Sequence, residues 1–162
     1  MKRGIVLGLA IVLLVTCQKI PQRYTQTSDE IELSKALIKD YNNKNWTKLV
    51  SYYTDSSKIF YNSTKSMSSE KIPAFHQKNE SSFLERGFFE EGQEYEMVVT
   101  DKGETWVNFW GTWRGTLTVN GELIEIPVHI TSQYKNGKII KEYGYWDNAP
   151  ILIAIQKSEI AE

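Results

Sequence analysis

The sequence has few of the residues that build disulfides, metal centres or phosphate-binding loops. It contains one cysteine and two histidines in 162 residues. A single cysteine excludes an internal disulfide, although a domain without one can still fold in an oxidising compartment. His76 and His129 lie in different predicted elements, and neither has metal-ligand spacing around it. We also find no Gly-rich phosphate loop and no nucleophile elbow, so no metal or other cofactor is expected.

An excess of charge of either sign is also missing. The chain has 19 Lys and Arg against 20 Asp and Glu, for a net charge of −1. This balance gives no support for binding nucleic acid through bulk positive charge. Aromatic residues, in contrast, are plentiful at 12%, with five Trp and nine Tyr. Two explanations are open: a large aromatic core in a β-rich fold, or a pocket lined by aromatic side chains.

The apolar run at the N-terminus is too short to span a bilayer comfortably. Residues 5–15 follow Lys2 and Arg3 and precede Thr16-Cys17, which is typical of an export signal. Residues 14–17, LVTC, resemble the lipobox of bacterial lipoproteins, in which the cysteine is acylated and becomes the first mature residue. The family usually has Gly, Ala or Ser where this chain has Thr16. The alternative is that Cys17 is an incidental residue of an ordinary signal peptide or membrane anchor.

The lipobox resemblance implies an organisation for the N-terminal region. Residues 1–16 would be the signal peptide, and residues 17–27 would be the lipidated Cys17 (carrying palmitate or a similar acyl chain) with a polar tether. Acyl chains add about 0.8 kcal/mol of membrane affinity per buried CH₂. The expected partner is therefore a membrane of the bacterial cell envelope, on its periplasmic or cell-surface side.

Two helices are predicted at the start of the folded domain. Thr27 and Glu30 fit a capping box for the first helix. Apolar residues then recur at helical spacing as far as Tyr41, and polar residues 42–45 end the pattern. A second, shorter helix is predicted from Trp46, ending before residues 55–57.

The second half of the chain predicts strands joined by tight turns. Asn120-Gly121 and Asn136-Gly137 favour type I′ turns, because both dipeptides adopt positive φ easily. Gly111 and Gly115 are expected to mark bends or bulges in a long strand. Helices followed by a curled antiparallel sheet indicate an α+β fold. The predicted strands cover residues 94–100, 105–119, 123–134 and 139–146.

Three segments are similar to the nuclear-transport-factor-2-like superfamily, and within it to the SnoaL-like polyketide-cyclase group. LSKALIKDYNNKNWTKLVSYYTDSSKIFYN resembles the opening helix pair and first strand, KNGKIIKEYGYWD the family hairpin, and ILIAIQ the terminal segment. The resemblance covers about residues 28–156, and we place the domain at residues 28–158. It implies a cone: a strongly bent antiparallel sheet wrapped around N-terminal helices, with a pocket open at one end.

The resemblance leaves more than one function open, because the family includes binding modules, dimers and enzymes. The first hypothesis is an exported, lipid-anchored protein whose cone binds a small apolar ligand or a partner protein. The alternative is a small-molecule enzyme of the isomerase, cyclase, dehydratase or hydrolase type that uses Asp147 as acid and base. A homodimer formed through the open sheet face is a third expectation.

Alternation along the last predicted strand places Ile139, Lys141, Tyr143, Tyr145 and Asp147 on one face. The resemblance to epoxide hydrolases implies that Asp147 faces the pocket and acts as a base, with a pKa raised by loss of hydration. The alternative role for Asp147 is to cap the following helix.

Two further residues join this candidate catalytic group. His129 could form a relay with Asp147, or be an ordinary strand histidine. Arg114 matches the family arginine, whereas Thr116 stands where those hydrolases have a second Asp, which argues against epoxide hydrolysis. The alternative for Arg114 is an exposed strand residue. Side chains expected to line the ligand pocket are Tyr143, Tyr145 and Trp110.

Overall fold

The computed structural model describes residues 23–78 and 80–160. The predicted signal peptide and Cys17 lie outside these residues. No helix within the described part of the chain is long and apolar enough to cross a membrane. The elements in chain order are β1 (Tyr24–Thr25), α1 (Asp29–Asn42), α2 (Trp46–Val50), β2 (Tyr53–Tyr61), η1 (Ser69–Lys71), α3 (Ile72–Gln77), η2 (Glu80–Ser82), β3 (Phe83–Phe88), β4 (Glu94–Val99), β5 (Thr105–Leu117), β6 (Leu123–Lys135), β7 (Lys138–Trp146) and α4 (Ala149–Ile160).

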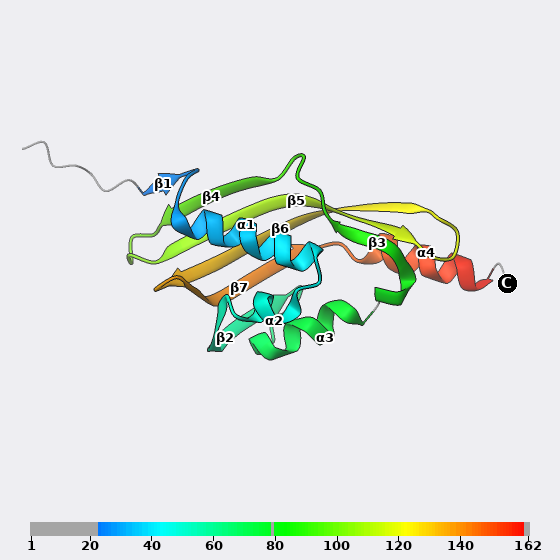
Figure 1. Cartoon of the computed structure of the whole chain (residues 1–162), viewed down its shortest axis with the longest axis horizontal. Coiled ribbons are helices and arrows are strands. Elements are labelled where there is room, and N and C mark those ends of the chain that lie inside the picture. The colour runs from blue at the N-terminus through cyan, green and yellow to red at the C-terminus, as the bar shows by residue number, and fades with distance from the viewer. Residues whose placement is uncertain (1–22, 79, 161–162) are drawn as a thin grey trace, which may run out of the picture.

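One seven-stranded sheet organises the fold, in the order β1-β4-β5-β6-β7-β2, with β3 pairing the second half of β5. The sheet is strongly curved and does not close, and α1 lies along its concave side (Figure 1). Among the strands of the described residues, β2 alone runs parallel to its neighbour, β7. The predicted α+β cone and its meander of four long strands are confirmed.

The inner face of the sheet and one side of α1 form the core. Along β5 the odd-numbered residues Val107, Phe109 and Leu117 are buried, whereas Trp110 on the other face is exposed. The buried side of α1 includes Ile31, and it packs against this face. This alternation along β5 is typical of a strand with one buried face. Each fully buried large apolar side chain contributes about 1.5–3 kcal/mol to the stability of the fold.

The prediction that the strand glycines mark bulges is wrong for the ladder between β5 and β6. The β5–β6 pairing runs without interruption through Gly111 and Gly115, so neither glycine marks a bulge in this ladder. Instead, the ring of the residue two positions earlier lies over each glycine: Phe109 over Gly111 and Trp113 over Gly115. A Cβ atom on either glycine would stand within 2.5 Å of that ring, so the absence of a side chain makes room for an aromatic core residue.

The irregularity that matters lies between β6 and β7. The register shifts there between Gln133 and Tyr134, which pair with Lys141 and Ile139. Ile139 is therefore fully buried, whereas Tyr143 is only partly buried on the outer face. The prediction that Ile139 shares a face with Lys141 and Tyr143 is wrong, because a bulge adds a residue and inverts the alternation.

Three shorter elements also differ from the sequence prediction. Helix α2 ends at Val50, and Tyr53 already belongs to β2, where it pairs with Ile139. The last part of the predicted tether contributes an edge strand, β1, which pairs with β4. Strand β3 was not predicted.

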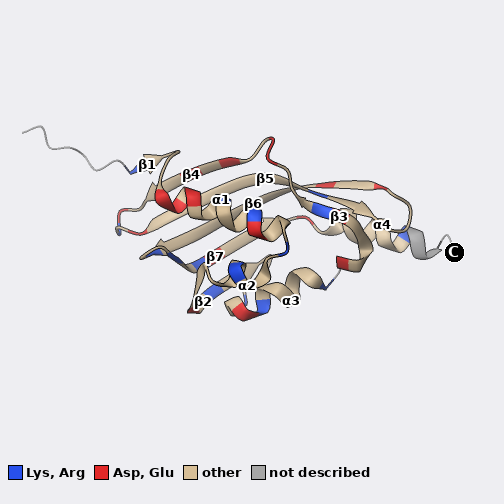
Figure 2. Cartoon of the chain, in the orientation of Figure 1, with Lys and Arg blue, Asp and Glu red and all other residues tan. Residues whose placement is uncertain are grey.

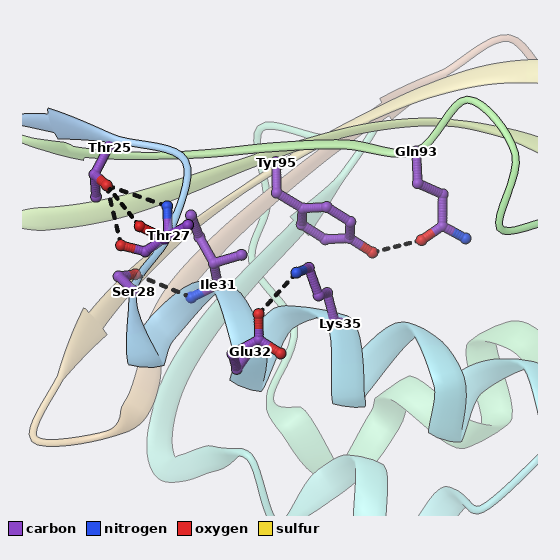
Figure 3. Close-up of polar contacts among 8 residues, drawn as sticks. All are labelled: Thr25, Thr27, Ser28, Ile31, Glu32, Lys35, Gln93 and Tyr95. Carbon is purple, nitrogen blue, oxygen red and sulfur yellow. Dashed lines mark hydrogen bonds and ion pairs between the residues drawn. The ribbon is translucent and has the colours of Figure 1, made fainter.

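Helix α1 begins one residue later than the capping box indicated. The side chain of Ser28 accepts a hydrogen bond from the Ile31 N–H at 3.2 Å, whereas Thr27 bonds to Thr25 (Figure 3). The first turn then carries Asp29, Glu30 and Glu32, seen as the red start of α1 in Figure 2. Negative side chains in the first turn stabilise the helix, because they lie at the positive end of its dipole.

We predict that Ser28→Ala lowers the free energy of unfolding by about 1 kcal/mol, because the Ile31 N–H loses its capping acceptor. Urea denaturation of the full chain measures this change. Thr27→Ala is the matched control, since it removes a hydroxyl one residue away that does not cap the helix. An equal loss in both variants would contradict the assignment of Ser28 as the cap.

Candidate functional site

A cavity of about 130 Å³ lies between the helices and the inner face of the sheet. A dry cavity of roughly 150 Å³ binds one benzene molecule, so this one is similar in size to a site for a single ring. Its wall combines α1, α3, β3, β5, β6, the end of β7 and the start of α4. The lining residues are mostly aromatic or aliphatic: Tyr41, Phe75, His76, Phe83, Phe88, Trp113, Ile126, Val128, Ile130, Trp146, Asn148 and Ile151.

Tyr41 supplies a hydroxyl group to this cavity. Its oxygen accepts a hydrogen bond from Trp113 Nε1 at 3.0 Å. The guanidinium of Arg86 lies 4.3 Å from the Tyr41 ring centre and pairs with Glu80 at 3.0 Å. Burial raises the pKa of Tyr41, with the nearby Arg86 charge acting in the opposite direction. The phenol therefore keeps its proton at neutral pH and can donate a hydrogen bond to a ligand.

His76 supplies a neutral imidazole. Its ring lies 5.0 Å from Tyr41, 5.2 Å from Phe75 and 5.5 Å from Tyr61, centre to centre. Burial lowers the pKa of His76 to about 3, and the positive charge of Arg86 adds to the shift. An imidazole with so low a pKa is a weak base at neutral pH. It can nevertheless offer a hydrogen bond to an uncharged ligand.

A buried carboxylate lies behind this wall. Glu142 is 1% exposed and accepts hydrogen bonds from the hydroxyls of Tyr53 at 2.9 Å, Tyr61 at 2.6 Å and Ser132 at 2.7 Å. Burial raises the pKa of Glu142, while these hydroxyls oppose the shift. The ring of Tyr61 also contacts Trp146, which lines the cavity. Tyr61 thus connects the carboxylate to the cavity wall.

The structure places Asp147 and Arg114 outside the group that lines the inner cavity. Asp147 is exposed, and its Oδ1 accepts a hydrogen bond from the Ala149 N–H at 2.8 Å, at the start of α4. This bond satisfies the first free N–H group of the helix, which agrees with the alternative role, although Asn148 is the residue whose carbonyl accepts the first bond of α4. Arg114 forms an ion pair with Glu125 on the neighbouring strand.

The other four predicted site residues do come together, but on the outer face of the sheet. The rings of Trp110 and His129 are 5.0 Å apart and nearly parallel. His129 lies 6.4 Å from Tyr145, and Tyr145 lies 6.4 Å from Tyr143. Alternation correctly grouped them, since His129 stands between Trp110 and Tyr145 across the strands. It did not indicate which face of the sheet is concave.

Sequence reasoning missed Tyr41, His76 and Glu142. The sequence pattern indicates Tyr41 only as part of the apolar side of a helix, and His76 only as a histidine without a metal partner. The sequence did contain a signal for Glu142. It is the one carboxylate in β7, and it lies two residues before Gly144 on the inner face. Among the described residues, no group of three or more His, Cys, Asp or Glu side chains is arranged to hold a metal ion.

Comparison with solved structures supports the fold. The chain has the nuclear-transport-factor-2-like fold. IdmH from Streptomyces antibioticus, a proposed polyketide cyclase, superposes with a TM-score of 0.65 at 14% identity, over 80% of this chain and 99% of IdmH. A proposed polyketide cyclase from Xanthomonas campestris gives 0.63 at 12%, over 78% and 96%.

A third solved structure agrees with these two. A proposed SnoaL-like polyketide cyclase from Shewanella denitrificans superposes with a TM-score of 0.59 at 20% identity, over 81% of this chain and 99% of that one. No family model and no curated protein matches the sequence. At these identities the likeness establishes the fold and leaves the function to the site itself.

We predict that Glu142→Gln becomes more stable relative to the wild type as the pH rises. The unfolded chain releases the Glu142 proton near pH 4.3, whereas the folded chain holds it to higher pH. Between these values the unfolded state binds fewer protons, so the wild type loses stability with rising pH. For each pKa unit between the folded and the unfolded value, the free energy of unfolding falls by about 1.4 kcal/mol.

Urea denaturation of both proteins between pH 4 and pH 8 measures this difference, because the other titrating groups cancel. Glu125→Gln, which changes an exposed carboxylate, is the control. A difference between wild type and Glu142→Gln that does not change with pH would show that Glu142 titrates normally.

Proposed function

We propose that the cone binds a small uncharged molecule carrying one ring. The observation that supports this is the composition of the inner cavity, which joins aromatic and aliphatic walls to three neutral polar groups: the Tyr41 hydroxyl, the His76 imidazole and the Asn148 amide. Apolar walls provide affinity, and a few placed polar groups fix orientation. A carbonyl or hydroxyl on the ring could bond to Tyr41 or His76.

An uncharged ligand fits better than an ion. None of the described residues that line the cavity is Asp, Glu, Lys or Arg. Moving an ion out of water without a partner costs far more than burying a hydrogen-bonded neutral group. The nearest cation, Arg86, is already paired with Glu80 and stacked on Tyr41. The cavity therefore selects against both carboxylates and ammonium groups.

The enzyme hypothesis depends on Asp147, which lies next to a residue of the cavity wall. Asp147 caps α4 and is followed directly by Asn148, which lines the cavity. Turnover of a bound compound by the wild type, and its loss in Asp147→Asn with binding retained, would favour catalysis. Binding without turnover in both proteins favours a receptor. We argue for the receptor because the His76 imidazole is a weak base and Glu142 is enclosed by hydroxyls.

We predict that acetophenone, which has one ring and one carbonyl, raises the melting temperature of the full chain, whereas benzoate of similar size does not. Ligand at 100 times its dissociation constant adds about 2.7 kcal/mol to the free energy of unfolding. Tyr41→Phe should weaken acetophenone binding by about five- to tenfold, the usual value of one hydrogen bond. Thermal shift and calorimetry measure these effects.

Ile130→Phe and Thr131→Phe provide a matched pair for this test. Ile130 lines the cavity, whereas its neighbour Thr131 lies on the outer face, so the same substitution fills the cavity only at residue 130. We expect loss of binding in Ile130→Phe alone. Equal binding in both variants, or stronger binding of benzoate than of acetophenone, would overturn the proposal.

We further propose that the protein is exported and held on a membrane of the cell envelope through acylated Cys17. The support is the basic, apolar and cysteine-terminated N-terminal sequence. We predict that Cys17→Ala moves the protein from the membrane fraction to the soluble envelope fraction, as measured by fractionation and immunoblotting. Thr16→Ala, which restores the usual residue before the cysteine, is the control and should stay membrane-bound. Unchanged membrane association of Cys17→Ala would contradict lipid anchoring.

A further inference from the structure

A second hollow, of about 610 Å³, lies at the outer face of the sheet. It uses a different part of the molecule from the inner cavity, and of the lining residues only Val128 is shared. We call it the outer groove. Its aromatic and acidic members are Tyr24, Glu94, Tyr95, Glu96, Trp110, His129 and Tyr145.

Strand register builds the outer groove. Glu94 on β4 pairs with Trp110 on β5, which pairs with His129 on β6, which pairs with Tyr145 on β7. Four consecutive strands therefore carry a carboxylate followed by three rings in one row. Directly opposed side chains on neighbouring strands lie about 4.5–5.5 Å apart, so this row is a property of the sheet and needs no loop to assemble it.

The rings of this row remain accessible. Trp110 is 37% exposed and Tyr145 is 52% exposed, and Tyr24 at the edge of the groove is 50% exposed. His129 lies between Trp110 and Tyr145, and its Nε2 atom is buried without a hydrogen-bond partner within the described residues. Burial lowers the pKa of His129, with Glu96 acting in the opposite direction. The histidine is thus a neutral ring in an aromatic stack.

The charge of the groove has one sign. Glu94 and Glu96 line it, and no Lys or Arg is among its described lining residues. The red segments on β4 and on the preceding loop in Figure 2 show that this edge of the sheet is acidic. The nearest arginine along β5, Arg114, is already paired with Glu125. Two interactions favour a cation at such a site. The faces of the aromatic rings are partly negative, and the carboxylates carry a full negative charge.

We propose that the outer groove binds small organic cations, with a substituted ammonium group held against the Trp110 ring and facing Glu94 and Glu96. A quaternary or tertiary ammonium group fits this wall better than a metal ion, because its alkyl groups pack on the rings while its charge is met by the carboxylates. A second copy of the chain fits less well. A two-fold contact through this face would bring each acidic row toward its own copy.

Choline and 3,3-dimethylbutan-1-ol test this proposal, because the two have the same shape and differ in charge. The full chain has five tryptophans, and their indole N–H signals in a ¹H–¹⁵N spectrum report separately on the two faces. Trp110 lines the outer groove, whereas Trp113 and Trp146 line the inner cavity. We expect choline to shift the Trp110 signal with saturation in the millimolar range, and the neutral alcohol to leave it in place.

Two pairs of variants test whether choline binds at the outer groove. Glu94→Gln should weaken choline binding by about two- to fivefold, as measured from the Trp110 signal. Trp110→Leu lacks that signal, so its similar weakening is measured by calorimetry against the wild type. Glu70→Gln removes the same charge on η1, and Phe89→Leu removes an exposed ring outside the outer groove, so both should bind choline like the wild type.

Equal shifts with choline and the neutral alcohol would overturn the proposal, as would equal weakening in Glu70→Gln and Glu94→Gln. Shifts confined to Trp113 and Trp146 would also overturn it, because they would place the cation in the inner cavity. A dimer in sedimentation experiments whose Trp110 signal is insensitive to choline would assign the face to a second copy instead. None of these results depends on the ligand of the inner cavity.

Discussion

The uninterrupted ladder between β5 and β6 is the constraint on which the rest of the structure depends. It holds Thr105 to Thr116 against Leu123 to Tyr134 in one register. Because side chains alternate with a period of two, this register decides which residues face the helices and which face outward. A slip of one residue would move Val128 and Ile130 out of the inner cavity and bring His129 into the core.

The two explanations for the abundance of aromatic residues both hold, on opposite faces of this ladder. Inside the cone, Phe109 packs edge-on against Phe88, and Trp113 donates its N–H to Tyr41. These rings are core residues that also form a cavity wall. Outside, Trp110 stacks on His129 with nearly parallel rings. A large ring stabilises the interior by losing its contact with water, whereas on the surface it keeps a face or an edge available for binding.

Sequence patterns predicted the fold well because the fold depends on local signals. Asn136-Gly137 turns between β6 and β7 with both residues at positive φ, and the long strands lie within two residues of their predicted bounds. The candidate site was harder, because Tyr41, His76 and Trp113 come from three separate elements. The row of Trp110, His129 and Tyr145 on one face agrees with alternation in each strand, but the prediction placed Trp110 and Tyr145 in the ligand pocket and His129 beside Asp147. Which face is concave depends on how the whole sheet curls and where the helices pack, and no local pattern contains that information.

Glu142 shows how the fold can hold a carboxylate inside an apolar cone. Three hydroxyls surround it, so each of these hydrogen bonds is made by a neutral donor, and none of the described Lys or Arg side chains bonds to it. Such a cluster is stable only while all its members are in place, because the loss of one hydroxyl leaves a buried charge short of a partner. Tyr61 belongs to this cluster and also contacts His76 and Trp146 in the cavity wall. The position of the wall is therefore tied to a polar network that cannot shift without cost, which favours a cavity of fixed shape over one that adapts to many ligands.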